Sequence, residues 1–209
     1  MGEVGCATWG HAVGVPAKVR TRAARSFWWD REPLAEADVL RAVIFDADSA
    51  LTDVGRDTPR IGLVDSVMSL FCAGVWIGIV STRRREQALS QVRHVVGDGI
   101  VETIVTVDDL GDIKAGHARV AELYRLALWE LGITAQDALA VVGSGRGLRA
   151  AMSADLPAVV LTAGDDVDER VVGAAAVRVG YSVPHPLLAA DCQRTHRLWS
   201  IAQQRSRAA

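Results

Sequence analysis

From residue 41 onward, short apolar runs alternate with segments whose apolar residues recur at helical spacing. Apolar runs that end at polar residues are typical of buried strands in a parallel sheet. Such strands are predicted at 41–46, 75–80, 103–107, 138–142 and 158–162, with helices at 61–73, 83–95, 115–131 and 148–154. Strand–helix alternation with right-handed crossovers predicts an α/β fold, a three-layer sandwich with a mostly parallel central sheet.

The two ends of the chain do not share this alternation. Residues 1–40 contain scattered glycines, a basic patch from Lys18 to Arg25 and the pair Trp28-Trp29, without a helical or strand period. We interpret them as an extension that is poorly structured or docked, and the functional alternative is a lid or a partner-binding arm. The core domain is expected at 41–182, followed at 183–209 by a polar tail or helix.

Composition excludes several classes of protein. Half of the 209 residues are hydrophobic and 23% are charged, as in an ordinary globular domain. The net charge of -2 provides no general attraction to nucleic acid or membrane. The distant cysteines Cys6, Cys72 and Cys192 argue against a metal cluster and for reduced thiols in a cytoplasm. No run reaches the roughly 18 apolar residues of a membrane helix, and Lys18 and Arg20 are among the residues that argue against a signal peptide.

Polar side chains follow the predicted strands where each strand ends. These residues are Asp46 and Asp48, Ser81 and Thr82, Asp108, and Ser144. Ligands of open parallel sheets bind beyond the carboxyl ends of the strands. Burying two neighbouring carboxylates is costly unless a cation or a reaction uses them. The sequence therefore predicts a site at this edge of the sheet, centred on Asp46 and Asp48.

The segment Val43-Ile-Phe-Asp-Ala-Asp-Ser-Ala-Leu-Thr-Asp53 resembles the first motif of the haloacid dehalogenase (HAD) superfamily, an apolar strand followed by Asp-x-Asp-Gly-Thr-Leu-x-Asp. Residues 79–81 resemble the second motif, a strand that ends in Ser or Thr. Residues 105–110 followed by Lys114 resemble the approach to the third-motif lysine, and residues 124–151 resemble the segment around the fourth motif. Over residues 40–180, the chain is most similar to the β-phosphoglucomutase-like phosphatases.

This resemblance implies a Mg²⁺-dependent phosphatase that acts on a small phosphorylated metabolite. Asp46 would be the nucleophile that forms an aspartyl-phosphate, and Asp48 would protonate the leaving oxygen and then activate water. Ser81 would bind the phosphoryl oxygens, and Lys114 would neutralise their charge. Mg²⁺ would be bound by the Asp46 carboxylate and the Asp48 backbone carbonyl. Substrate binding is assigned to Ser81 together with Thr82 and Ser144.

Two departures from the family pattern concern the first and third motifs. Ser49-Ala50 replaces the Gly-Thr that follows the acid pair. Counting forward from the third strand makes Lys114 the third-motif lysine, whereas counting back from Tyr124 gives Ala118. An insertion of one helical turn reconciles the two counts, and Arg119 is the alternative cation.

Two further departures concern the metal and the cap domain. Val142-Gly143-Ser144 occupies the positions of the fourth-motif acids that bind Mg²⁺, so we expect a weakened metal site. The acids of 164–169 are a conceivable substitute, but they follow the next strand. Residues 53–81 leave no room for a cap beside the helix at 61–73. An uncapped site argues against a mutase, which must exclude water; the N-terminal arm or a second subunit is the alternative cover.

Other conspicuous residues receive structural interpretations. Arg83-Arg84-Arg85 is expected to be a solvated helix start. Gly143 to Gly147 resembles a phosphate-cradling loop, but a tight strand-to-helix turn explains this pattern equally well. Trp76 and Trp129 are expected in the core, and no histidine is given a role. Two functions therefore remain: a HAD phosphatase with weakened activity, or a catalytically impaired HAD-fold protein that binds a phosphometabolite or a protein partner.

Overall fold

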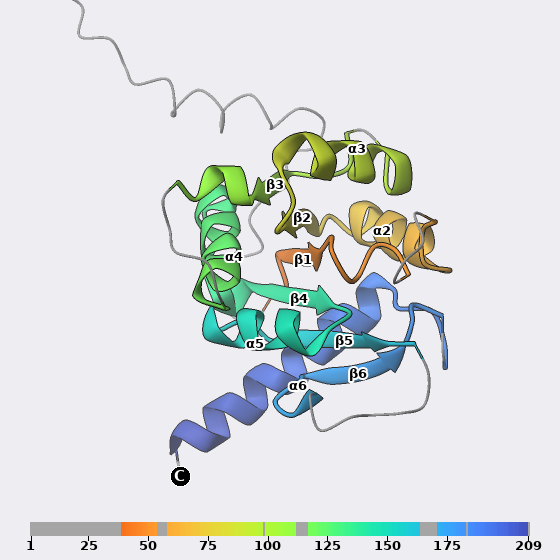
Figure 1. Ribbon diagram of the computed structural model, residues 1–209. Helices are drawn as coiled ribbons and strands as arrows, with labels where there is room; N and C mark the ends of the chain where they lie inside the picture. The colour runs from red at the N-terminus through yellow and green to blue at the C-terminus, as the bar shows by residue number, and fades with distance from the viewer. Residues whose placement is uncertain are drawn as a thin grey trace, which may run out of the picture. The chain divides into compact units, whose positions relative to one another are not determined.

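The computed structural model describes most of the chain beyond residue 38 (Figure 1). The described ranges are 39–53, 58–97, 99–111, 117–163, 171–182 and 184–208. Three features predicted above lie wholly or largely outside these ranges: the extension at 1–40, Lys114 as the third-motif cation, and the acids of 164–169 as substitute metal ligands. They stay predictions.

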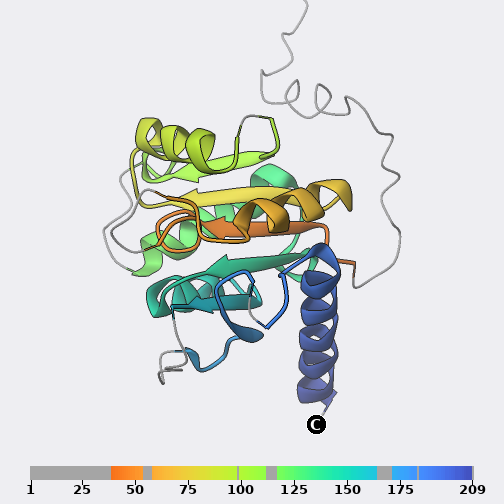
Figure 2. The same ribbon diagram turned by 90° about the vertical axis from the view of Figure 1, so that its right-hand side faces the viewer.

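Six parallel strands form the central sheet, in the order β3-β2-β1-β4-β5-β6 (Figures 1 and 2). The strands are β1 (Ala42–Asp46), β2 (Trp76–Ser81), β3 (Thr103–Thr106), β4 (Ala138–Val142), β5 (Ala158–Thr162) and β6 (Ala176–Val179). The first five were predicted from the sequence, and their ends agree to within one residue. β6 was missed because this short edge strand is only partly buried, so its sequence is not a continuous apolar run.

Helices cover both faces of the sheet (Figure 2). They are α2 (Leu63–Cys72), α3 (Arg85–Val95), α4 (His117–Leu131), α5 (Gly145–Ser153) and α6 (Ala189–Ala208), with 3₁₀ turns η2 (Val107–Asp109) and η3 (Ala135–Asp137). Side chains alternate along β1: Val43 and Phe45 pack with α2, α3 and α6, whereas Ala42 and Ile44 pack with α4 and α5. The strands contribute side chains to two separate cores, so they are apolar at nearly every position. This arrangement confirms the predicted three-layer sandwich.

Local expectations differ from the structure at two places. Helix α5 begins at Gly145 rather than at 148, because Ser144 caps it by accepting a hydrogen bond from the Gly147 backbone N–H. The prediction that Trp129 lies in the core is wrong: its side chain is 64% exposed on α4, whose inner face is formed by neighbours such as Leu128. Trp76 is half-buried, and the Arg41 guanidinium lies 5.2 Å from its ring centroid.

The C-terminal segment forms helix α6, which packs on the face of the sheet that also carries α2 and α3. Cys192 and His196 are buried, and His196 Nε2 lies 2.7 Å from the Gln136 carbonyl oxygen. The first half of α6 is therefore part of the folded core. Among the described residues, no helix combines the length and apolar character that crossing a membrane requires.

Candidate active site

Asp46 is the last residue of β1, the strand at which the order of the sheet reverses. Chain connections leave β1 toward β2 on one side, and β4 lies on the other, so the end of β1 faces the crevice where open parallel sheets bind ligands. The chain turns at once beyond the strand, because the Ala50 backbone N–H donates to the Asp46 carbonyl oxygen at 2.7 Å. This turn places Asp48 beside Asp46, and the Asp48 N–H donates to Asp46 Oδ1 at 3.0 Å.

Asp46 is only 7% exposed, and its environment changes the acidity of its carboxyl group. Burial raises the pKa of Asp46 from 3.8 to about 6, against the hydrogen bond from Ser49 Oγ, which lowers it. The negative charge of Asp48 also raises this pKa, and smaller opposing contributions come from the Asp48 N–H and the Arg146 charge. Asp46 is therefore a buried, poorly solvated carboxyl group with a raised pKa, a combination that is common at functional sites.

Asp48 is held by the second predicted motif. Ser81 Oγ donates to Asp48 Oδ1 at 2.8 Å, and Thr82 donates to Asp48 Oδ2 through its N–H at 2.7 Å and its hydroxyl at 2.6 Å. Arg83 Nε lies 3.7 Å from Asp48 Oδ1. The structure thus brings together four of the predicted site residues, the two acids, Ser81 and Thr82, and adds a cation.

Arg83, Arg84 and Arg85 are all exposed, as expected for a solvated helix start, but two of them also form ion pairs. Arg83 faces Asp48, and Arg85 Nη2 forms an ion pair with Asp109 Oδ1 at 2.7 Å. The Arg85 backbone N–H also donates to Asp108 Oδ2 at 2.8 Å. These contacts join residues more than twenty positions apart, so the local charge run did not reveal them.

Backbone groups at the end of β4 contact the loop that carries the acid pair. The Gly143 N–H donates to Ser49 Oγ at 2.9 Å, and Ser49 Oγ donates in turn to Asp46 Oδ2 at 2.7 Å. A Cβ atom at Gly143 would lie 2.0 Å from the Ser49 carbonyl oxygen, and one at Gly147 would lie 2.6 Å from Asp46 Oδ2. Only glycine therefore fits at either position. Ser144, the remaining predicted substrate-binding residue, directs its hydroxyl to the Gly147 N–H at 3.1 Å.

Sequence reasoning missed two polar side chains near these residues. Tyr124 on α4 is fully buried, and its hydroxyl has no hydrogen-bond partner among the described residues. Burial, together with the charges of Asp46 and Asp48, raises the pKa of Tyr124 well above its ordinary value. Arg60 is 6% exposed and donates from Nε to the Thr52 carbonyl oxygen at 3.2 Å. Tyr124 lies at the start of the segment that resembles the fourth motif, but that pattern does not indicate its burial near the acid pair; Arg60 lies in no motif.

Arg119, the alternative to Lys114, lies on α4 near the end of β3. Its Nη2 donates to the Val107 carbonyl oxygen at 3.4 Å, and its Nε is buried with no partner among the described residues. Arg119 therefore reaches the correct edge of the sheet, but no contact places it on the acid pair.

Comparison with known proteins agrees with the motifs. No family model matches the chain. Protein CbbY of Cereibacter sphaeroides is 32% identical over 131 residues, which are 63% of this chain and 56% of CbbY, so the chain spans about half the length of this curated relative. The fold is shared with β-phosphoglucomutase of Clostridium difficile (TM-score 0.61, 14% identity, 78% of this chain and 100% of that one). The chain is therefore similar in sequence to CbbY and in fold to β-phosphoglucomutase, as its resemblance to the HAD motifs predicts.

A second structural neighbour extends the comparison of folds. The cobalt-bound deoxy-D-mannose-octulosonate 8-phosphate phosphatase of Haemophilus influenzae has a TM-score of 0.52 at 12% identity, over 78% of this chain and 90% of that one. At this identity the match concerns the fold alone. It shows that the sandwich described here covers nearly the whole of that chain.

HAD phosphatases generally use Mg²⁺, but the residues at this site do not fit the usual Mg²⁺ donor set. Mg²⁺ prefers octahedral oxygen ligands, with one or two carboxylates among them. Among the expected ligands, the Asp46 carboxylate already accepts one hydrogen bond on each oxygen, from the Asp48 N–H and from the Ser49 hydroxyl. Gly143 stands where the superfamily has an acid. No group of three or more potential ligands occurs among the described His, Cys, Asp and Glu residues.

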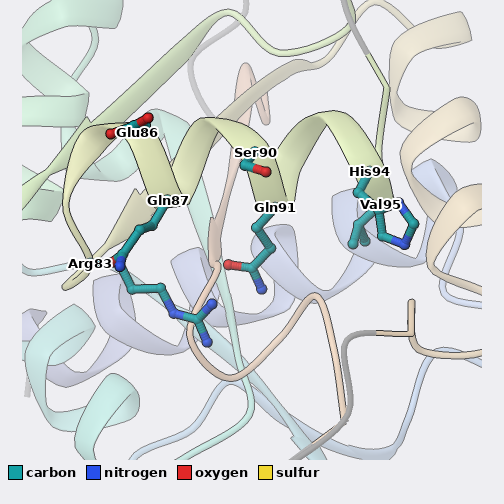
Figure 3. Close-up of a pocket in the computed structure, with 7 residues that line it drawn as sticks. All are labelled: Arg83, Glu86, Gln87, Ser90, Gln91, His94 and Val95. Atoms are coloured by element: carbon teal, nitrogen blue, oxygen red, sulfur yellow. The ribbon is translucent and has the colours of Figure 1, made fainter.

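A groove lined mainly by polar side chains runs along α3 (Figure 3). Its volume is about 580 Å³, and its lining residues are Arg83, Glu86, Gln87, Ser90, Gln91, His94 and Val95. Gln91 connects the groove to the acid loop, because its Nε2 donates to the Ala47 carbonyl oxygen at 3.2 Å and lies 3.5 Å from Thr52 Oγ1. Its Oε1 is buried and without a partner among the described residues. Arg83 borders both the groove and Asp48.

Proposed function

We propose that this protein is a HAD phosphatase that hydrolyses a small phosphate ester through an aspartyl-phosphate on Asp46. The observation that carries this proposal is the placement of Asp46 and Asp48 side by side at the switch point of the sheet, next to the hydroxyl groups of Ser81 and Thr82. A buried, ionised carboxylate at this position is suited to attack a phosphorus atom held above the end of β1.

The chemistry proceeds in two displacement steps. An Asp46 carboxylate oxygen bonds to phosphorus while the ester oxygen leaves and takes a proton from Asp48. Water then gives a proton back to Asp48 and attacks the aspartyl-phosphate, which releases phosphate and restores Asp46. Asp48 now accepts hydrogen bonds from Ser81 and Thr82. Substrate entry must therefore displace one of these donors, whose hydroxyl can then bind a phosphoryl oxygen.

The groove along α3 is the proposed position of the leaving group (Figure 3). It begins at Arg83, beside Asp48, and its wall carries mainly amide, hydroxyl and charged side chains. Such groups recognise hydroxyl-bearing molecules better than apolar ones. A small phosphorylated metabolite is therefore the expected substrate class.

Several predictions from the sequence accompany this proposal without support from the described residues. They are Lys114 as a phosphate-binding cation, Ser144 as a substrate ligand, and Mg²⁺ at Asp46 and Asp48. The same holds for three further predictions: a cytoplasmic location, the absence of a nucleic-acid partner, and a cover supplied by the N-terminal arm or a second subunit. No step described above depends on any of these.

The second candidate function is a catalytically impaired HAD-fold protein that binds a phosphometabolite or a protein partner. The observation that favours it is Gly143, which replaces the fourth-motif acid at a place where a side chain would collide with Ser49. Loss of that acid removes negative charge from the site, and with it the usual means of holding a metal against the transferred phosphoryl group.

Hydrolysis of p-nitrophenyl phosphate tests the proposal. We expect release of p-nitrophenol by the full chain, measured with EDTA and with millimolar Mg²⁺, and its loss in Asp46→Asn. Retention of the fold by this variant is checked by circular dichroism. Absence of turnover in a folded protein under both conditions would favour the impaired alternative.

A further inference from the structure

We infer that this site binds a phosphate group without a resident divalent cation, and that the guanidinium groups of Arg146 and Arg83 take the place of the metal charge. The inference rests on the proposed function for the location of the phosphate group. It concerns how the site balances charge, which the superfamily assignment does not determine.

The first step is steric. The superfamily holds its metal partly through an acid at the end of the strand that corresponds to β4, and Gly143 occupies that position. A Cβ atom there would lie 2.0 Å from the Ser49 carbonyl oxygen and 2.8 Å from its carbonyl carbon. Both are backbone atoms, so a side chain at this position would have to force β4 and the acid loop apart.

The second step concerns Ser49, which replaces a glycine of the superfamily motif. Its hydroxyl donates to Asp46 Oδ2 at 2.7 Å and accepts from the Gly143 N–H at 2.9 Å. Asp46 is therefore linked to β4 through a hydroxyl group instead of a shared cation. The second Asp46 oxygen is fixed by the Asp48 N–H at 3.0 Å, so the carboxylate is oriented without a metal.

The third step is the balance of charge. Arg83 Nε lies 3.7 Å from Asp48 Oδ1. Arg146 is exposed in the first turn of α5, next to Gly147, where a Cβ atom would lie 2.6 Å from Asp46 Oδ2. One arginine thus lies beside Asp48, and a second is the chain neighbour of the glycine that packs against Asp46. A guanidinium group can also offer two parallel donors to a phosphate, which provides the positive field that a metal would otherwise supply.

Calorimetric titration of the full chain with inorganic phosphate tests this inference. One titration is done in EDTA and a second with 5 mM Mg²⁺, both at about 0.15 M salt. We expect the two dissociation constants to agree within about twofold, and Arg146→Gln to weaken binding in EDTA by about tenfold, as for loss of a charge-assisted pair. Arg149→Gln is the matched control, because Arg149 is exposed on the same helix, and it should leave binding unchanged.

The possible outcomes separate the inference from the proposed function. Phosphate binding that Mg²⁺ strengthens tenfold or more, absence of binding in both buffers, or equal affinity in Arg146→Gln and Arg149→Gln would overturn the inference. Binding in EDTA without hydrolysis of p-nitrophenyl phosphate would support the inference and contradict the phosphatase. Hydrolysis that requires Mg²⁺ would support the phosphatase and contradict the inference.

Discussion

The Ser49 hydroxyl group donates a hydrogen bond to Asp46 Oδ2 at 2.7 Å, and both side chains are more than nine-tenths buried. Ser49 stands where the superfamily motif has glycine, so this contact is a property of the present chain. It stabilises the ionised form of a carboxylate that burial would otherwise keep protonated to higher pH.

Replacing Ser49 with alanine removes this hydrogen bond. We expect the pKa of Asp46 to rise above its value of about 6, because the ionised form loses a donor while the burial remains. Titration of the Asp46 side-chain carbon by NMR in EDTA measures the change. Ser90→Ala, at an exposed serine on α3, is the control, and an unchanged or lower pKa in Ser49→Ala would contradict the role given to Ser49.

Asp46 should make the folded protein less stable as the pH rises. Its folded pKa of about 6 exceeds the ordinary 3.8, so the folded state binds the proton more tightly than the unfolded state does. The stabilisation that comes from protonated Asp46 in the folded state is complete below about pH 4 and is lost as the pH rises through about 6. A difference of about two pKa units corresponds to roughly 3 kcal/mol at most.

The variant Asp46→Asn provides the measurement. We expect its free energy of unfolding in EDTA, from urea titrations, to exceed that of the natural chain by about 1–3 kcal/mol at pH 7.5 and to match it at pH 4. Asp65→Asn is the control, since this acid is exposed on α2. A natural chain that becomes more stable relative to Asp46→Asn between pH 4 and 7.5 would contradict the raised pKa.

Gly143→Ala should destabilise the fold by about 1–3 kcal/mol or more, because the added methyl group meets the Ser49 backbone and forces β4 and the acid loop apart. Urea unfolding measures the loss. Gly97→Ala is a useful comparison: its Cβ would meet nothing within 4 Å, so its cost comes from the left-handed backbone at φ 97° alone. A smaller loss at Gly143 than at Gly97 would show that the acid loop is not packed against β4.

Tyr124→Phe removes a buried hydroxyl group that has no partner among the described residues, and it retains the ring. We expect the free energy of unfolding to stay within about 0.5 kcal/mol or to increase, because no hydrogen bond is lost and a buried polar group is removed. Urea denaturation measures it, with Tyr181→Phe as the contrast. Tyr181 donates to the Ala50 carbonyl oxygen at 2.9 Å, so its loss should cost about 1–2 kcal/mol.

Much of the fold was predictable because its signals are local. Apolar runs and helical spacing of apolar residues predict the strands and the helices between them, and five of the six strands were placed in this way. Edge strand β6 lacks that signal because it is partly exposed, and Trp129 shows that an aromatic residue between apolar neighbours can still face solvent. The acid pair was recognisable because its spacing and position after a strand are local as well.

The sequence by itself determined the three-layer sandwich, the edge at which polar residues gather, and the identity of Asp46 and Asp48 as its centre. Tertiary structure alone decided what surrounds them: Arg83 beside Asp48, the buried Tyr124 hydroxyl, and the Ser49 hydroxyl between Asp46 and Gly143. The reason is physical. Periodicity records which face of a strand or helix is buried, whereas Ser49 and Gly143 are 94 positions apart and meet only because β1 and β4 pair in the sheet.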